Sequence, residues 1–409
     1  MRLACFVSNF MKHFMYGHSG LAAIFGYANI IFPNSKYNLI ADKHIKSSIS
    51  LIEGTKTPQP LGFFSGITGI AFSASYLADN SNNYKNLLAS LDNIIFKNTR
   101  ELTLNLENRH NNGLPRYYFD VISGISGVGS YLLQRGTVES LKTLEDVLDI
   151  IIYLTEQNKN MLSFRTSTDL LFNWEKNIFK DGVIDCGMAH GIAGPLSLLS
   201  LSYMQGIRQD GIKDAIASIS DWIIKNSPKI NGYVDIPGIV EVEKYKNEVN
   251  YVEAMRPSDK HIQTRVAWCY GNPGTSRAIY LAGKALAKDS YIETAIQGMV
   301  NAYKRIGEDN AAKLDSPTFC HGIAGVLDIT LRFWNDTRKA IFKEQGTLLL
   351  NRLCEMYDEN AIFRYKNLDF EHKLEDNCGM LEGTSGILLS LLAATTETDP
   401  KLDRAFLIS

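Results

Sequence analysis

Two short stretches place sulfur and imidazole side chains directly before glycine turns. "WCYGNPG" contains Cys269, and "FCHGIAG" contains the adjacent pair Cys320 and His321. Two thiolates and one imidazole suit zinc, and a catalytic zinc site typically uses three protein ligands and leaves a fourth position open. A cysteine before a turn is also common in a protein core. The metal interpretation therefore requires a fold that brings the two stretches together.

Three more residues near glycine turns could act on a substrate. His190 precedes a glycine in "MAHGIAG", and imidazole titrates near neutral pH, which suits acid–base catalysis. Asp120, in "FDVISG", could orient that imidazole, and Arg265 could place a cation near Cys269. Alternatives remain open: a hydrogen-bonded structural histidine, and a surface salt bridge for the arginine. Cys186, four residues before His190, is a rival sulfur ligand that lies outside the glycine pattern.

A Gly-x-x-Gly step followed by an apolar stretch recurs along the chain and connects these residues. One such step is uninformative, but repetition at intervals of roughly 50 to 80 residues is typical of a repeat architecture. Glycine permits close backbone approach and a tight turn into a following helix. The seven steps begin at Gly17, Gly66, Gly124, Gly191, Gly271, Gly322 and Gly383.

Amphipathic segments lie between the glycine steps. After Tyr84, leucine and isoleucine recur at helical spacing, with Lys85 and Asp92 on the opposite face. Segments after the glycine steps are apolar on more sides, as expected of helices packed all round. Further amphipathic segments lie near 38–53, 138–156, 211–225, 288–305 and 338–357.

These patterns predict an all-α fold over residues 1–409, an α/α toroid of seven inner and seven outer helices. The end repeats are as apolar as the middle ones, which favours a closed ring because an open array needs polar caps. In a ring, all seven loops would meet at one centre, together with the positive ends of the inner helices. Because little chain precedes Gly17, the first outer helix could be short or supplied by the C-terminal end.

Two stretches are longer than a loop requires. Residues 228–264 alternate apolar and polar side chains, which predicts an inserted β-containing lid. Residues 158–186 are a possible second insertion.

Bulk composition narrows the function further. Lys and Arg total 42 and Asp and Glu total 44, so nucleic acid is not a favoured partner. No apolar run approaches the roughly 20 residues of a membrane span. Six cysteines without an export signal predict reduced thiols and a cytoplasmic location, with any membrane association peripheral at the inner face.

The quoted motifs, together with "RVAWCYGNPG", "YFDVISG" and "LEGTSG", resemble the lanthionine cyclase (LanC-like) family over essentially the entire chain. The resemblance implies zinc held by Cys269, Cys320 and His321. It implies a reacting centre formed by His190, Asp120, Arg265 and Tyr270. Two details depart from the family: Ser123 stands where related cyclases often carry an acidic residue, and "GNPG" replaces a more glycine-rich form.

The implied activity is ring closure in a dehydrated precursor peptide of a lantibiotic. A peptide cysteine would add to dehydroalanine or dehydrobutyrine and form a thioether. The family also implies a dehydratase and a peptide exporter as partners.

Other functions stay open on the residues alone. One is a different zinc-thiol transferase on a toroid, glutathione-adding or prenyltransferase-like. A glycosidase needs paired central carboxylates, for which only Asp120 and Glu382 lie in register. A non-enzymatic, zinc-stabilised peptide-binding scaffold would need a fourth protein ligand, for which His190 is the candidate in register.

Overall fold

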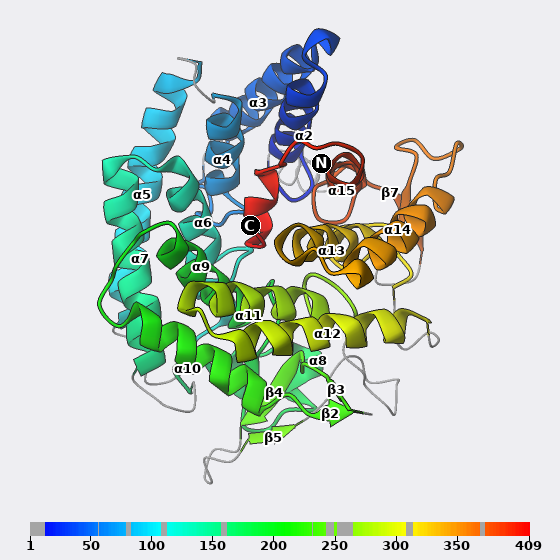
Figure 1. Ribbon diagram of the computed structural model, residues 1–409. Helices are drawn as coiled ribbons and strands as arrows, with labels where there is room; N and C mark the ends of the chain where they lie inside the picture. The colour runs from blue at the N-terminus through cyan, green and yellow to red at the C-terminus, as the bar shows by residue number, and fades with distance from the viewer. Residues whose placement is uncertain are drawn as a thin grey trace.

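Seven helices follow the seven glycine steps and form a closed ring (Figure 1). The computed structural model describes residues 13–55, 57–78, 83–107, 113–156, 162–230, 232–242, 249–251, 265–307, 314–368 and 373–409. Each inner helix contacts the next one along the chain, and the last contacts the first, which closes the ring. The predicted helical toroid is therefore confirmed. The inner helices are α2 (His18–Ile31), α4 (Ile67–Leu77), α6 (Ile125–Arg135), α9 (Ala193–Met204), α11 (Asn272–Leu286), α13 (Ile323–Thr337) and α15 (Thr384–Thr395).

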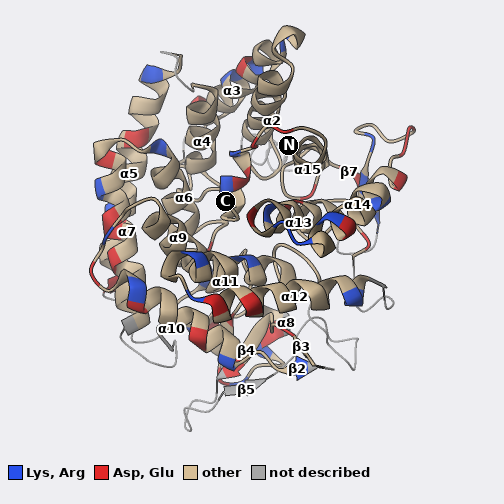
Figure 2. Ribbon diagram, in the orientation of Figure 1, with Lys and Arg blue, Asp and Glu red and all other residues tan. Residues whose placement is uncertain are grey.

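Six amphipathic helices pack outside the ring in the described part of the chain. They are α3 (Tyr37–Glu53), α5 (Lys85–Glu107), α7 (Val138–Glu156), α10 (Ile212–Lys225), α12 (Asp289–Gly307) and α14 (Ala340–Glu355). Acidic and basic segments are interspersed along α5, α7 and α10 (Figure 2). The predicted seventh outer helix would precede Gly17, and residues 1–12 lie outside the described part. Within the described residues, no helix is both long and apolar enough to cross a bilayer.

The C-terminal end does not supply an outer helix, contrary to one expectation, but lies in the middle of the ring (Figure 1). Its short 3₁₀ helix η7 (Leu402–Phe406) brings Phe406 against Phe319, with ring centroids 3.6 Å apart. Trp268 packs edge-on against Phe406 and donates its indole N–H to the Phe406 carbonyl oxygen at 3.0 Å. Because all three aromatic residues are fully buried, side chains fill this part of the ring.

Backbone hydrogen bonds join each glycine loop to the next around the whole ring. Each loop also folds tightly onto its own backbone, which explains the glycines: a Cβ on Gly274 or Gly325 would lie 2.0 Å from a carbonyl oxygen of its own loop. Gly271 also has φ of 87°, a conformation that other residues rarely adopt. The donor–acceptor pairs are Met15 to Phe64, Phe64 to Ile122, Val121 to Ala189, Ala189 to Cys269, Cys269 to Cys320, Cys320 to Leu381 and Met380 to Met15.

The two long stretches meet in one small antiparallel sheet. Strand β1 (Val183–Asp185) pairs with β4 (Ile239–Val242), which pairs with β5 (Val249–Tyr251). The described part also contains the short helix α8 (Asn173–Lys176). Two further hairpins are formed by β2 (Lys229–Ile230) with β3 (Tyr233–Val234) and by β6 (Lys366–Leu368) with β7 (Leu374–Asp376). Residues 243–248 and 252–264 lie outside the described part. The lid role of this insertion stays a prediction.

Candidate active site at the glycine loops

The two cysteines predicted to bind metal lie on neighbouring loops, before α11 and α13. The backbone N–H of Cys269 donates to the carbonyl oxygen of Cys320 at 3.1 Å. Their side chains also interact, and this contact lowers the pKa of Cys269 despite its burial. The same contact, together with burial, raises the pKa of Cys320 well above its usual range. Cys269 is therefore the more acidic thiol of the two.

The third predicted ligand, His321, directly follows Cys320 and is half-buried. Within the described residues, no three His, Cys, Asp or Glu side chains converge at a spacing suited to a metal. The structure thus brings two of the three predicted ligands together and does not assemble the complete set. The donor types nevertheless suit zinc, because two thiols lie close together and the residue after Cys320 is a histidine, on a loop that lies outside regular helix.

The rival sulfur ligand is a core residue. Cys186 is fully buried, and burial raises the pKa of its thiol well above the usual range. Its sulfur lies 3.9 Å from the carbonyl oxygen of Ile184.

His190 and Asp120 form a direct pair, as their loop positions predicted. Nδ1 of His190 lies 2.6 Å from Oδ2 of Asp120, and the other carboxylate oxygen accepts the N–H groups of Ser123 at 2.7 Å and Gly124 at 2.8 Å. Burial opposes the imidazolium, but the Asp120 carboxylate outweighs it and raises the pKa of His190. With Nδ1 bonded to Asp120, Nε2 is the ring nitrogen that can face a substrate.

Tyr270 and Arg265 lie close to the thiol pair. The Tyr270 hydroxyl donates to Oδ2 of Asp185 at 2.8 Å, and burial raises the pKa of Tyr270 well above its usual range. The positive charge of Arg265 favours the thiolate form of both Cys269 and Cys320.

Sequence reasoning missed the residues that support Tyr270. Asp185 is buried at the end of β1, where Nε of Arg116 lies 3.1 Å from its Oδ2. Arg116 also donates to Glu175 of α8 at 2.9 Å. Burial raises the pKa of Asp185, although the Arg116 charge acts in the opposite direction. The only sequence signal was a carboxylate two residues before a glycine in "VIDCG", which is weak.

A second, partly buried pair lies on the far side of the thiols from His190 in ring order. The Tyr16 hydroxyl donates to Oε2 of Glu382 at 3.0 Å, and the negative charge of Glu382 acts on Cys320. Burial raises the pKa of both Tyr16 and Glu382. Both residues stand beside the first glycine of their steps, which was the signal available from sequence.

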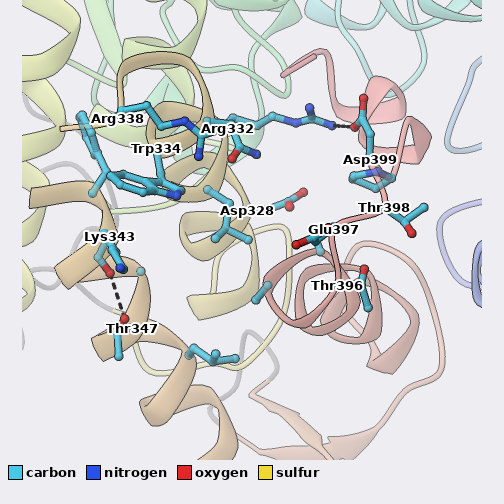
Figure 3. A pocket seen from close by; sticks show the side chains of 18 residues that line it. Asp328, Arg332, Trp334, Arg338, Lys343, Thr347, Thr396, Glu397, Thr398 and Asp399 are labelled. Atoms are coloured by element: carbon cyan, nitrogen blue, oxygen red, sulfur yellow. Dashed lines mark hydrogen bonds and ion pairs between the residues drawn. The ribbon is translucent and has the colours of Figure 1, made fainter. Parts of the chain in front are cut away.

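A cavity of about 740 Å³ lies elsewhere, at the C-terminal ends of α13 and α15 (Figure 3). It is lined by side chains of both charges, including Asp328, Arg332 and Arg338, together with Trp334. The glycine loops begin these two helices, so the cavity is at the opposite end of the ring wall. None of the predicted site residues lines it.

Known proteins share the sequence pattern and the fold of this chain. Residues 13–407 match the family model described as lanthionine synthetase C-like protein. The nisin biosynthesis protein NisC of Lactococcus lactis subsp. lactis is 29% identical over 334 residues, covering 80% of this chain and 72% of the relative. A solved structure of nisin cyclase matches with a TM-score of 0.78 and 24% identity, covering 97% of this chain and 92% of that one. This second likeness shows a shared fold. The chain therefore belongs to the lanthionine synthetase C-like family.

Proposed function

We propose that the protein is a zinc-dependent lanthionine cyclase. It would add cysteine thiols of a dehydrated lantibiotic precursor peptide to dehydroalanine or dehydrobutyrine residues of the same peptide. The observation that carries the proposal is the contact between the Cys269 and Cys320 side chains. It lies in the same ring of hydrogen-bonded glycine loops that holds the His190–Asp120 pair. The full-length match to the lanthionine synthetase C-like family supports it.

Cys269, Cys320 and His321 would hold the zinc. Because no three-ligand cluster is assembled among the described residues, His321 would turn toward the thiol pair when the metal binds. Zinc bound there would lower the pKa of a substrate thiol from its ordinary value of about 8.5.

The addition breaks the S–H bond and the C=C π bond and forms a C–S bond at Cβ and a C–H bond at Cα. His190, held through Nδ1 by Asp120, would deliver the proton to Cα from Nε2. Arg265 would stabilise the enolate that forms after thiolate attack, since its charge already acts on both cysteines. In the alternative assignment, His190 first removes the thiol proton.

The substrate chemistry also implies partners. Dehydroalanine and dehydrobutyrine arise from serine and threonine by loss of water, so a dehydratase would act on the peptide first. A peptide exporter would receive the cyclised product, and the reaction would occur in the cytoplasm.

The decisive experiment incubates a dehydrated, cysteine-containing peptide with the zinc-loaded protein, then with a thiol-alkylating reagent, followed by mass spectrometry. Cyclisation leaves the peptide mass unchanged and removes one alkylatable thiol per ring. Full alkylation at the rate of the protein-free control would contradict the proposal. A parallel reaction that also contains reduced glutathione tests the glutathione-adding alternative, which a peptide mass increase equal to one glutathione would indicate.

A further inference from the structure

Asp185 uses its two carboxylate oxygens for two different contacts. Oδ1 accepts the backbone N–H of Gly187 at 2.9 Å, and Oδ2 accepts the hydroxyl of Tyr270 at 2.8 Å. Its side chain is only 1% exposed. Since an ionised carboxylate only accepts hydrogen bonds, the hydroxyl proton of Tyr270 points toward Asp185.

Gly187 supports the ring of the same tyrosine. A Cβ on Gly187 would lie 2.7 Å from both Cδ1 and Cε1 of Tyr270 and 2.6 Å from the carbonyl oxygen of Cys269. The aromatic ring therefore lies directly on the backbone of Gly187. The N–H of Ala189 donates to the same Cys269 carbonyl at 3.3 Å, which fixes this segment against the thiol loop. Tyr270 is thus held at its ring and at its hydroxyl.

Arg116 connects this support to the other half of the site. It lies 3.1 Å from Asp185, and it also donates to Glu175 at 2.9 Å. Its carbonyl oxygen accepts the backbone N–H of Asp120 at 3.0 Å. One residue therefore supports both the carboxylate that holds Tyr270 and the loop of the carboxylate that holds His190.

The small sheet fixes the backbone of Asp185 from outside the ring. Asp185 pairs with Ile239 of β4, and the N–H of Cys186 donates to the carbonyl oxygen of Gly238 at 2.8 Å. On the ring side, the Asp185 carbonyl accepts the N–H of Ile192 at 2.9 Å, just before α9. The inserted strands therefore act as a structural support for the glycine loops.

We propose that Asp185 is a positioning residue for the cyclisation proposed above and acts on it through Tyr270. It turns the Tyr270 hydroxyl proton inward, so that the phenol oxygen presents its remaining lone pairs beside the Cys269–Cys320 pair. That oxygen can accept a hydrogen bond from a backbone N–H of the precursor peptide and thereby fix the orientation of the acceptor residue. The inference rests on the proposed function.

A double-mutant cycle tests the inference with zinc-loaded, full-length protein. Asp185→Asn should lower kcat about 10-fold or more with little change in KM, because orientation rather than binding is lost. In the Tyr270→Phe background, Asp185→Asn should have no further effect, since a residue that acts only through Tyr270 is silent once the hydroxyl is gone. Additive losses from the two substitutions would overturn the proposal.

Asp235→Asn is the matched structural control. Asp235, which follows β3, is a comparably buried carboxylate. It lies 3.4 Å from Arg305 of the outer helix α12. Its kcat should stay within about two-fold of wild type even where its melting temperature falls. Equal kcat losses in Asp185→Asn and Asp235→Asn would mean that Asp185 is merely structural, which contradicts the proposal.

A second readout separates this inference from the proposed function. In protein labelled with 3-fluorotyrosine, the Tyr270 resonance is identified by its absence from Tyr270→Phe. It should shift in Asp185→Asn and stay in place in Asp235→Asn. An unshifted resonance overturns the positioning contact, whatever the activity. If the Tyr270 resonance shifts in Asp185→Asn but the wild-type protein forms no thioether, the contact stands. The catalytic role of that contact and the proposed function are then both overturned.

Discussion

Nδ1 of His190 lies 2.6 Å from Oδ2 of Asp120, although 70 residues separate them along the chain. The contact arises because their glycine loops are neighbours in the ring, where Val121 donates its N–H to the carbonyl oxygen of Ala189. Asp120 is in turn fixed by two backbone N–H groups of its own loop. The imidazole is therefore oriented by a carboxylate that has little freedom to move.

Replacing His190 with alanine should stop cyclisation and leave zinc content unchanged. The imidazole is the group that would donate the proton to Cα, and it is not among the proposed ligands. Peptide mass spectrometry after alkylation and metal analysis of the same sample check the two halves. Wild-type cyclisation by His190→Ala would remove this residue from the mechanism.

Replacing Asp120 with asparagine should move the alkaline limit of activity to lower pH. The carboxylate raises the pKa of His190, so its removal lowers that pKa, and a proton donor is lost as pH rises through its pKa. The pH dependence of stability has the same sign. The His190–Asp120 ion pair stabilises the fold fully below the pKa of an unfolded histidine, about 6.5, and this stabilisation is lost as pH rises through the raised pKa of His190 in the folded protein. A pH–kcat profile checks this, with exposed Glu139→Gln as the control. An unshifted alkaline limb would contradict it.

Replacing Cys320 with alanine should lower zinc content well below one ion per chain. Two thiolates and one imidazole are the proposed set, and loss of one leaves too few ligands for a stable site. Cys354→Ala, an exposed cysteine on α14, is the control and should retain zinc. Equal zinc in the two variants would contradict the ligand assignment.

Replacing Gly325 with alanine should destabilise the protein by about 3 kcal/mol, because the new Cβ would overlap a backbone carbonyl oxygen. Gly346→Ala is the matched control, since its Cβ would meet only ordinary contacts at 3.6 Å or more inside α14. That change should stabilise by about 0.5–1 kcal/mol, because glycine is a poor helix former. Chemical denaturation measures both, and a neutral Gly325→Ala would contradict the close-approach argument.

Replacing Phe406 with alanine should destabilise the protein by about 3–5 kcal/mol. The ring is fully buried and stacks on Phe319 in the middle of the toroid. Phe172→Ala, at a side chain that is 66% exposed, is the control and should change the melting temperature little. Similar melting temperatures for the two variants would show that the C-terminal segment does not stabilise the ring.

The ring architecture could be predicted because each repeat carries its own signal. A glycine step is visible in the sequence wherever a loop folds tightly onto its own backbone, and the outer helices carry a one-sided apolar pattern. The same glycine steps indicated from the sequence that Cys269, Cys320, His190 and Asp120 belong to one site. Tyr270 came from family resemblance, and its contact with Asp185 had no repeat to reveal it.

Residues outside the register were missed for a physical reason. Asp185 and Arg116 meet only because the small sheet turns back onto the ring, and nothing in a one-dimensional pattern specifies that turn. The C-terminal segment was likewise misplaced, because its burial depends on the central space that only the closed ring creates.

The contact between α15 and α2 limits how a chain of this kind can change its number of units. A linear stack tolerates gain or loss of one unit, because each unit touches only its neighbours. In a closed ring, removal of one helix pair would increase the angle between every two remaining neighbouring pairs. The loops that carry Cys269 and Cys320 would then shift relative to each other. We therefore expect chains with this fold to diversify by insertion of segments between helix pairs, as with the sheet that carries Asp185. Duplication or loss of a whole helix pair should be rare.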